Sequence, residues 1–162
     1  MQPTRSQPLP YLDACVSASS MTTDGTERER RRALVHAHMA AENRHDVDAI
    51  MQTFAGTGEM IYNRVSFPSD DAIRGAHTYM GFSAAPGAFA GLRIVPDAEH
   101  FTAEEIVIEG RLCGKHVGEF LGFAPTNRDV ELPYVAFYRF DDDGKLASER
   151  VVMNLAPLRA GG

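Results

Sequence analysis

Apolar residues in the first half of the chain recur at helical spacing. Between residues 26 and 43 they form one stripe, with charged residues on the opposite side, which predicts an amphipathic helix. Asp46 is a good helix-capping residue, and the apolar positions after it again lie three and four apart until Gly56, which predicts a second, shorter helix. Residues 59–65 are typical of a strand, and residues 72–82 of a third helix.

Beyond Gly91 the pattern becomes strand-like. The predicted strands cover residues 92–101, 104–112, 114–123, 129–140 and 145–155. The run Asp141-Asp142-Asp143-Gly144 predicts a hairpin between the last two strands, because aspartate and glycine tolerate the positive φ angles of such turns. Helices followed by strands favour an α+β fold, with one strongly curved, mixed or antiparallel sheet wrapped around the N-terminal helices as a cone.

Residues 1–24 differ from the rest of the chain because they contain three prolines, many serines and threonines, and no periodic apolar pattern. Such a segment cannot bury enough surface to offset its ordering entropy, so we expect a disordered tail followed by a single domain over residues 25–162. Prolines interrupt the only candidate for a secretory signal, and no segment is long enough to span a membrane.

Net charge and cysteine content exclude several classes of protein. The net charge is −6, and the only basic run, residues 28–32, is interleaved with Glu27 and Glu29, which argues against nucleic-acid binding. Cys15 and Cys113 support neither a disulfide framework nor a zinc site, so we expect a cytoplasmic protein. The sequence shows no phosphate loop, serine nucleophile signature or spaced metal-ligand set, and it therefore predicts no cofactor and no metal.

Glycines alternate with bulky residues from Gly114 onward and stop at a Pro-Thr-Asn turn, which predicts a bent strand bordering a cavity. The pattern Gly-x-His-x-Gly-x-x-x-Gly-x-x-Pro-Thr-x-Arg over residues 114–128 resembles the SnoaL-like polyketide cyclases of the nuclear-transport-factor-two-like superfamily. The strand ending Tyr-Arg-Phe at residue 140 and the later Gly144-Lys145-Leu146 fit the same pattern, and the resemblance covers residues 32–158. It implies an α+β cone whose pocket binds a small, largely apolar, polyketide-like substrate, and we expect a homodimer.

His38 and Glu42 lie four residues apart on the apolar stripe of the first helix, which points both toward the sheet. An imidazole held by a carboxylate is a general acid or base near neutral pH. In the alternative, Glu42 turns to solvent and His38 is a hydrogen-bonded core histidine. The resemblance places Glu42 at a pocket-facing position.

Three further candidates lie on predicted strands. Tyr62 and Asn63 resemble a Tyr-x-Asn segment of the superfamily, but neighbours on a regular strand face opposite sides, so one of the two is structural. His116 has space beside its ring if the adjacent glycines border a ligand. In the alternative, those glycines serve backbone curvature and His116 binds a loop carbonyl.

The C-terminal strands depart from the family pattern. The resemblance aligns the histidine and the acid-base aspartate of the aldol-type cyclases with Ala136 and Val151, and neither can transfer a proton. Asn154 replaces a usual aspartate and cannot be a carboxylate base. Chemistry then falls to the other ionisable groups, so the predicted catalytic residues are His38, Glu42, His116 and Glu149. The predicted substrate-binding residues are Tyr62, Asn63, Tyr134, Tyr138, Val151 and Asn154.

The resemblance therefore implies a cofactor-independent enzyme of natural-product biosynthesis, a cyclase, isomerase or lyase that works by acid-base catalysis in an apolar pocket. One alternative is an epoxide-opening hydrolase or cyclase that uses Glu42 or Glu149 with Asn63. The other is a non-catalytic module that binds a small ligand, which the loss of charge at Ala136, Val151 and Asn154 favours. For Glu149 itself, the alternative to catalysis is a salt bridge to a neighbouring arginine. His36, His45 and His100 are expected at the surface.

Overall fold

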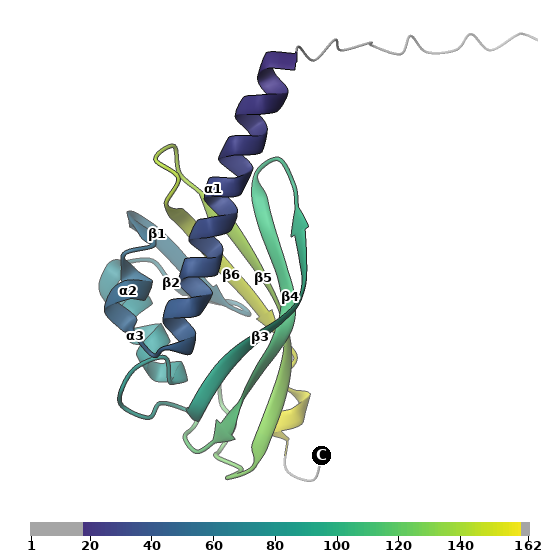
Figure 1. The fold of residues 1–162 in the computed structure, drawn as a ribbon. Coiled ribbons are helices and arrows are strands. Elements are labelled where there is room, and N and C mark those ends of the chain that lie inside the picture. The colour runs from purple at the N-terminus through teal and green to yellow at the C-terminus, as the bar shows by residue number, and fades with distance from the viewer. Residues whose placement is uncertain (1–17, 160–162) are drawn as a thin grey trace, which may run out of the picture.

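The computed structural model describes residues 18–159, in which helices cover the concave face of one curved, six-stranded sheet (Figure 1). The helices are α1 (Ala18–Asn43), α2 (Val47–Met51) and α3 (Asp70–Met80). The strands are β1 (Phe54–Tyr62), β2 (Val65–Phe67), β3 (Phe89–Phe101), β4 (Glu105–His116), β5 (Asp129–Phe140) and β6 (Leu146–Met153), followed by the 3-10 helix η1 (Ala156–Leu158). No helix in this part of the chain is both long and apolar enough to cross a bilayer.

The strand order is β2-β1-β6-β5-β4-β3, so β2 and β3 form the two edges of the sheet. Neighbouring strands are antiparallel except for β1 and β6, which pair in parallel. Helix α1 crosses the concave face, and α2 and α3 lie beside β1 (Figure 1). The predicted α+β fold with a strongly curved, mixed sheet is therefore confirmed.

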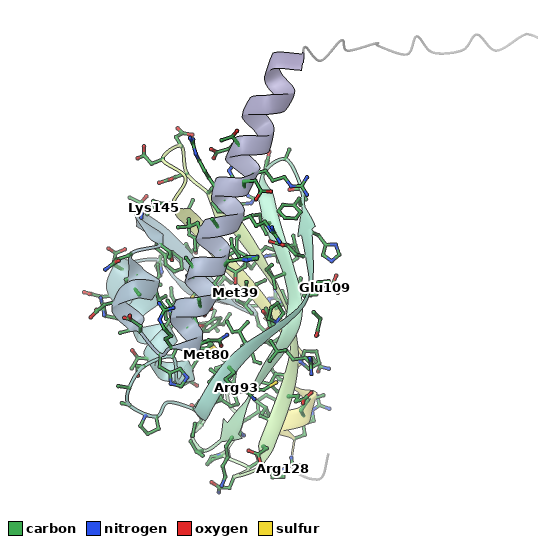
Figure 2. The ribbon with its side chains drawn as sticks, viewed as in Figure 1. Met39, Met80, Arg93, Glu109, Arg128 and Lys145 are labelled. Carbon is green, nitrogen blue, oxygen red and sulfur yellow. The ribbon has the colours of Figure 1, made fainter. Side chains whose placement is uncertain are left out.

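Strand β5 shows how the sheet divides inside from outside. Its side chains alternate, and Leu132, Tyr134, Ala136 and Tyr138 are buried while their neighbours are partly or fully exposed. Figure 2 shows the same division across the molecule, with Met39 on α1 lying among the side chains between helix and sheet. The interior is thus enclosed by α1, α3 and the inner faces of the central strands.

Two element boundaries differ from the predicted ones near residue 54. Helix α2 ends at Met51, and Phe54 starts β1 although it continues the apolar spacing of the helix. Gly56 and Gly58 lie inside β1, where the register against β6 shifts, so they accompany an irregularity in the strand and do not end a helix. Phe54 is a buried residue at the start of β1, and its match to the helical spacing of α2 is a coincidence.

The glycine-rich segment also differs from its prediction. Strand β4 runs unbroken through Cys113 to His116, and residues 117–128 are irregular. The backbone N–H groups of Val117 and Gly118 both donate to the carbonyl of Ala88 at 2.9 Å. A Cβ on Gly118 would lie 3.1 Å from the Ala88 Cα, so this glycine permits close backbone packing and does not border a ligand cavity.

Helix α1 begins at Ala18, before the expected start at residue 26. Residues 18–24 of the predicted tail are therefore helical, while residues 1–17 lie outside the described residues. The division of the chain at residue 24 stays a prediction.

Candidate active site

Helix α1 carries His38 and Glu42 one turn apart on its buried face. His38 is 0% and Glu42 is 2% exposed, and Val35 and Met39 are buried on the same face. The helix therefore brings an imidazole and a carboxyl group together into the interior, as the apolar stripe predicts.

Two further ionisable side chains reach the same place from other elements. His77 comes from α3, whose buried residues Ile73, Ala76, His77 and Met80 form one face of that helix. Glu149 comes from β6, where it lies opposite Met60 on β1 and Tyr138 on β5. His77 is 0% and Glu149 is 2% exposed, so four ionisable groups lie inside the cone.

His38, Glu42, His77 and Glu149 form what we call the interior cluster. The Nε2 atom of His38 lies 3.3 Å from Glu149 Oε2 and 3.6 Å from Glu42 Oε2. The Nε2 atom of His77 lies 3.6 Å from Glu42 Oε1 and 3.9 Å from Glu149 Oε2. Ligand atoms of His38, Glu42 and His77 all lie within 4.8 Å of one another, a spacing that one metal ion can bridge.

Hydrogen bonds on the far side of each ring determine which nitrogen carries a proton. The Thr53 hydroxyl donates to the Ile50 carbonyl at 2.6 Å, so its oxygen accepts from His38 Nδ1 at 2.8 Å. His77 Nδ1 donates to the Ile73 carbonyl at 2.9 Å. The Nε2 atoms of both rings therefore face the carboxyl groups, and neither has a hydrogen-bond partner.

Burial and mutual charge separate the pKa values of the four groups. Burial raises the pKa of Glu42 to about 8. Burial acts in the same direction on Glu149, but the interaction with His38, followed by smaller contributions from His77 and Tyr138, outweighs it and lowers the pKa. Burial alone would lower the pKa of His38, yet the two carboxylates raise it to about 9. Burial lowers the pKa of His77 to about 4.

These shifts give the two carboxyl groups different protonation states near neutral pH. Glu42 holds its proton, whereas Glu149 is a carboxylate paired with the cationic His38. His77 is neutral. A proton donor and a proton acceptor therefore lie side by side in a site shielded from water, which is the arrangement that acid-base catalysis requires.

Three tyrosines surround the cluster. Tyr62 and Tyr138 are 1% exposed and Tyr134 is 5% exposed. Burial, and then the charges of Glu42 and Glu149, raise the pKa of each phenol above its usual range, so all three remain hydrogen-bond donors. The hydroxyl oxygens of Tyr62 and Tyr134 have no hydrogen-bond partner.

The apolar wall of the site includes the two positions that distinguish this chain from the aldol-type pattern. Ala136 and Val151 lie directly opposite each other on β5 and β6, and both are buried on the inner face. Neither side chain can exchange a proton, so the interior cluster carries the ionisable groups of this region.

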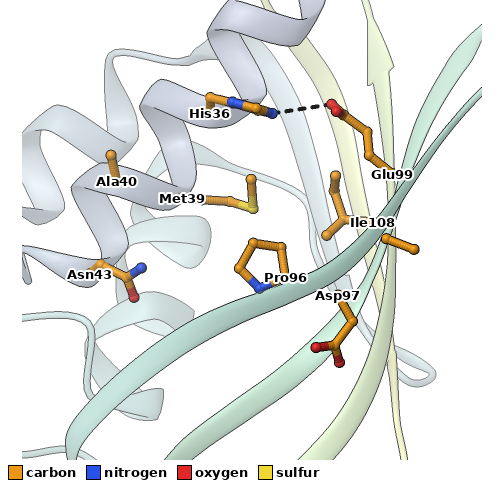
Figure 3. A pocket seen from close by; sticks show the side chains of 9 residues that line it. His36, Met39, Ala40, Asn43, Pro96, Asp97, Glu99 and Ile108 are labelled. Carbon is orange, nitrogen blue, oxygen red and sulfur yellow. Dashed lines mark hydrogen bonds and ion pairs between the residues drawn. The ribbon is translucent and has the colours of Figure 1, made fainter.

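A cavity of about 380 Å³ lies between α1 and the strands β3 and β4 (Figure 3). Its lining residues are His36, Met39, Ala40, Asn43, Pro96, Asp97, Ala98, Glu99 and Ile108. Figure 3 shows Met39 reaching from α1 toward Pro96 and Ile108. Ile108 pairs with Ala136, whose neighbours on the inner face are Tyr134 and Tyr138, so the cavity lies next to the tyrosines of the site.

His116 is also fully buried, but the structure does not bring it to the interior cluster. Its Nδ1 accepts from the Thr126 N–H at 3.3 Å, and its ring stacks on Phe89 with centroids 5.2 Å apart. Burial lowers its pKa. Among the described residues, no carboxylate forms an ion pair with it. The histidine therefore anchors a loop.

Two asparagines predicted to bind substrate occupy turns. Asn63 has a φ of 52° after β1, and its Oδ1 accepts from the Met153 N–H at 2.7 Å. Asn154 is exposed, and its Oδ1 accepts from the Ala156 N–H at 3.0 Å. The other predicted substrate-binding residues, Tyr62, Tyr134, Tyr138 and Val151, all lie on the inner face.

Three residues that matter here were not predicted from the sequence. His77 completes the interior cluster, and Thr53 orients the ring of His38. His45, expected at the surface, is partly buried and donates to the Leu92 carbonyl at 2.8 Å. His36 and His100 are exposed, as expected, and lie beside Glu99 and Glu109, respectively.

Sequence comparison agrees with the geometry of the cone. The family model for SnoaL-like polyketide cyclase matches residues 32–161. The chain belongs to this family. No curated protein sequence matches the chain.

Solved structures of other SnoaL-like proteins share the fold. A proposed SnoaL-like polyketide cyclase from Jannaschia sp. CCS1 is 18% identical, with a TM-score of 0.67 over 78% of this chain and 87% of the other. AclR, a proposed hydroxylase from Streptomyces galilaeus, is 25% identical, with a TM-score of 0.63 over 79% and 77%. SalBIII, an epoxide hydrolase/cyclase-like enzyme of pyran ring formation in the polyether salinomycin, is 16% identical, with a TM-score of 0.65 over 80% and 95%.

Proposed function

We propose that this SnoaL-like protein is an enzyme that isomerises, dehydrates or cyclises a small, polyketide-like molecule by proton transfer inside the cone. The observation that carries this proposal is the interior cluster, because two imidazoles and two carboxyl groups are buried with unpartnered atoms directed at one another. Burying so many polar atoms is costly, and such sites are typical of function. Family membership supports the class of substrate.

The two carboxyl groups take different roles in this mechanism. Glu149 accepts a proton from the substrate, because Tyr138 and His38 stabilise its ionised form. Glu42 delivers a proton to a substrate oxygen, since its Oε2 has no hydrogen-bond partner and burial favours the neutral acid. The hydroxyl of Tyr62 orients the substrate through its free donor. One proton leaves the substrate and one enters it, so no external reductant or oxidant is needed.

The cavity beside α1 receives the apolar body of the substrate. Its volume falls within the range of about 300–1,000 Å³ that is usual for small-molecule sites. Met39, which is 7% exposed, lies next to His38 in the chain and forms part of the cavity wall. Movement of this flexible side chain connects the cavity to the cluster.

Opening of an epoxide is the second candidate reaction. It is favoured by the neutral carboxyl group of Glu42, which can protonate an epoxide oxygen while Glu149 activates the attacking hydroxyl or water. The likeness to SalBIII shows the fold alone, yet it establishes that this fold occurs in an epoxide hydrolase/cyclase-like enzyme. Addition of water increases the mass of the product, whereas isomerisation and internal cyclisation leave it unchanged.

The test is a mass-spectrometric screen of linear, cyclic and epoxidised polyketide-like compounds with the purified protein. With any converted compound, Glu42→Gln and His38→Gln each lower kcat by about 10²-fold or more, the scale of general acid-base catalysis. The matched control is Glu109→Gln, a surface carboxylate paired with His100, which leaves kcat unchanged. Full turnover in Glu42→Gln contradicts the mechanism, and saturable binding without conversion favours a non-catalytic binding module.

A further inference from the structure

We propose that the interior cluster binds one divalent first-row transition metal ion, with His38, Glu42 and His77 as its ligands and the carboxylate of Glu149 beside them. The inference goes beyond proton transfer, because metal binding depends on the position of the four side chains and not on turnover of any substrate. The sequence predicted no metal site, since these residues come from three separate elements and share no spacing motif.

The distances within the cluster match the edges of a metal coordination sphere. Four ligand atoms arranged tetrahedrally at about 2.0–2.1 Å from a zinc-sized ion lie about 3.3–3.4 Å from one another. The two nitrogen-to-oxygen distances among the ligands are both 3.6 Å, from His38 Nε2 to Glu42 Oε2 and from His77 Nε2 to Glu42 Oε1. Glu149 Oε2 lies 3.3 Å from His38 Nε2 and 3.9 Å from His77 Nε2. Charge-assisted hydrogen bonds are shorter, at about 2.7–2.9 Å.

A surface pair in the same protein shows the hydrogen-bonded alternative. His100 Nε2 lies 2.8 Å from Glu109 Oε1, and both side chains are 54% exposed. The buried pairs are all longer than this, although the interior gives a stronger electrostatic incentive for close contact. The interior atoms are therefore spaced as ligands around a common centre.

The hydrogen bonds around the two rings also fit metal ligation. Metal-binding histidines usually donate their other ring N–H to a backbone carbonyl or another oxygen, which orients the ring and the free nitrogen. His38 makes this contact with Thr53 and His77 makes it with Ile73. The atoms left without a partner are His38 Nε2, His77 Nε2, Glu42 Oε2 and Glu149 Oε2. Three of these four buried atoms gain a partner when one ion binds among His38, Glu42 and His77.

The donor set indicates the class of ion. The ligands are two neutral imidazoles and one carboxylate, and a divalent cation also neutralises the neighbouring carboxylate of Glu149. Mixed nitrogen and oxygen donors suit zinc and iron, cobalt or nickel, whereas calcium and magnesium prefer oxygen ligands alone. Binding would displace the protons of the metal-free cluster, so the protein has two exclusive states, one protonated and one metal-bound.

The experiment uses the full-length protein without an affinity tag, freed of metal with a chelator and then dialysed. We expect titration with Co²⁺ to give tetrahedral visible absorption bands that saturate at one equivalent, and Zn²⁺ to displace the Co²⁺. Loss of an outer-shell partner typically weakens metal affinity by about 10–100-fold. In His77→Gln the ion loses a ligand, and its affinity for the protein falls by more than that. Thr53→Val keeps all three ligands and weakens affinity within that range.

The control variant is His100→Gln, which removes a histidine-carboxylate pair at the surface and binds as the parent does. Circular dichroism verifies that each variant is folded, and Thr53→Val tests the site if His77→Gln does not fold. The inference is overturned if the chelated parent binds neither ion at micromolar concentration, or if both variants bind like the parent. Turnover by the metal-free protein is measured separately, so failure of the metal site and failure of the proton-transfer mechanism are distinguishable.

Discussion

The interior cluster and the His116 corner are two buried histidine sites with different surroundings. His38 and His116 are both 0% exposed. The Nε2 atoms of both rings have no hydrogen-bond partner, but His38 faces the carboxyl groups of Glu42 and Glu149. His116 stacks on Phe89 and accepts a backbone N–H. The partners of a buried histidine, and not its burial, therefore distinguish a candidate catalytic group from a structural one.

The backbone of His116 strengthens this distinction. Its N–H donates to the Arg128 carbonyl at 2.9 Å, and its carbonyl accepts from the Asn127 N–H at 2.8 Å. Together with the contact to Thr126, these bonds connect the two ends of the irregular segment 117–128. The interior cluster has no comparable role in the backbone, because its contacts join three separate elements through side chains.

The largest expected effect separates the two sites by activity. Glu149→Gln removes the proposed proton acceptor and lowers kcat by about 10²–10⁴-fold. His116→Gln changes kcat by less than about 3-fold, because proton transfer of this size requires a group within reach of the substrate. The measurement is steady-state kinetics with a substrate from the screen. Equal losses in both variants would remove the distinction between the two sites.

A smaller effect concerns the backbone packing beside His116. Gly118→Val places a side chain against Ala88 and destabilises the fold by about 1–3 kcal/mol through overpacking. Urea unfolding followed by circular dichroism measures this loss. Gly56 in β1 is the comparison, because a Cβ there meets nothing within 4 Å and its φ is not positive. Unchanged stability in Gly118→Val would show that the close contact with Ala88 does not hold in solution.

The next prediction tests the ring of His116 itself. His116→Gln at pH 8 costs about 1–2 kcal/mol, since the Thr126 N–H loses its acceptor and the stacking on Phe89 is lost. Chemical unfolding at that pH gives the value, and His36→Gln at the surface is the control with no measurable change. If His116→Gln is as stable as the parent, the backbone hydrogen bonds of residue 116 alone hold the loop and its side chain does not contribute.

The smallest effect is the pH dependence of that difference. Burial lowers the pKa of His116 below the ordinary 6.5, so below that pH the unfolded chain binds a proton more readily than the folded chain. The parent therefore loses stability relative to His116→Gln as the pH falls from 6.5 toward the pKa of the folded state. Unfolding of both proteins between pH 8 and about pH 5 measures how far the difference in their stability narrows. A constant difference would contradict the lowered pKa.

The sequence predicts the elements of this site better than their assembly. The apolar stripe of α1 places His38 and Glu42 inside, and the strand period places Glu149 on the same face as Val151. His77 was missed although it shares a helical stripe with Ile73, a signal of the kind that identified His38. Periodicity shows which face of an element is buried. It does not show which two buried faces meet, because that depends on how α3 packs against α1 and the sheet.

The remaining differences between sequence and structure come from residues whose type suits two roles. Asn63 matches a substrate-binding pattern, but asparagine also tolerates the positive φ of a turn, and that is its role after β1. The glycines near His116 indicate missing side chains without indicating what fills the space. At Gly118 it is the backbone of Ala88, which lies 30 residues earlier in the chain, and no local pattern reports that contact.

The parallel pairing of β1 with β6 determines when the interior becomes complete during synthesis. Glu149 on β6 lies opposite Met60 on β1, so β1 can pair with this neighbour only after β6 has been synthesised. A nascent chain that has left the ribosome only through β5 already contains His38, Glu42 and His77, but no Glu149. Contacts between distant segments form late because loop closure precedes them. The protein therefore acquires its buried charge pair only after β6 has emerged, and a chain that ends before this strand lacks the carboxylate that pairs with His38.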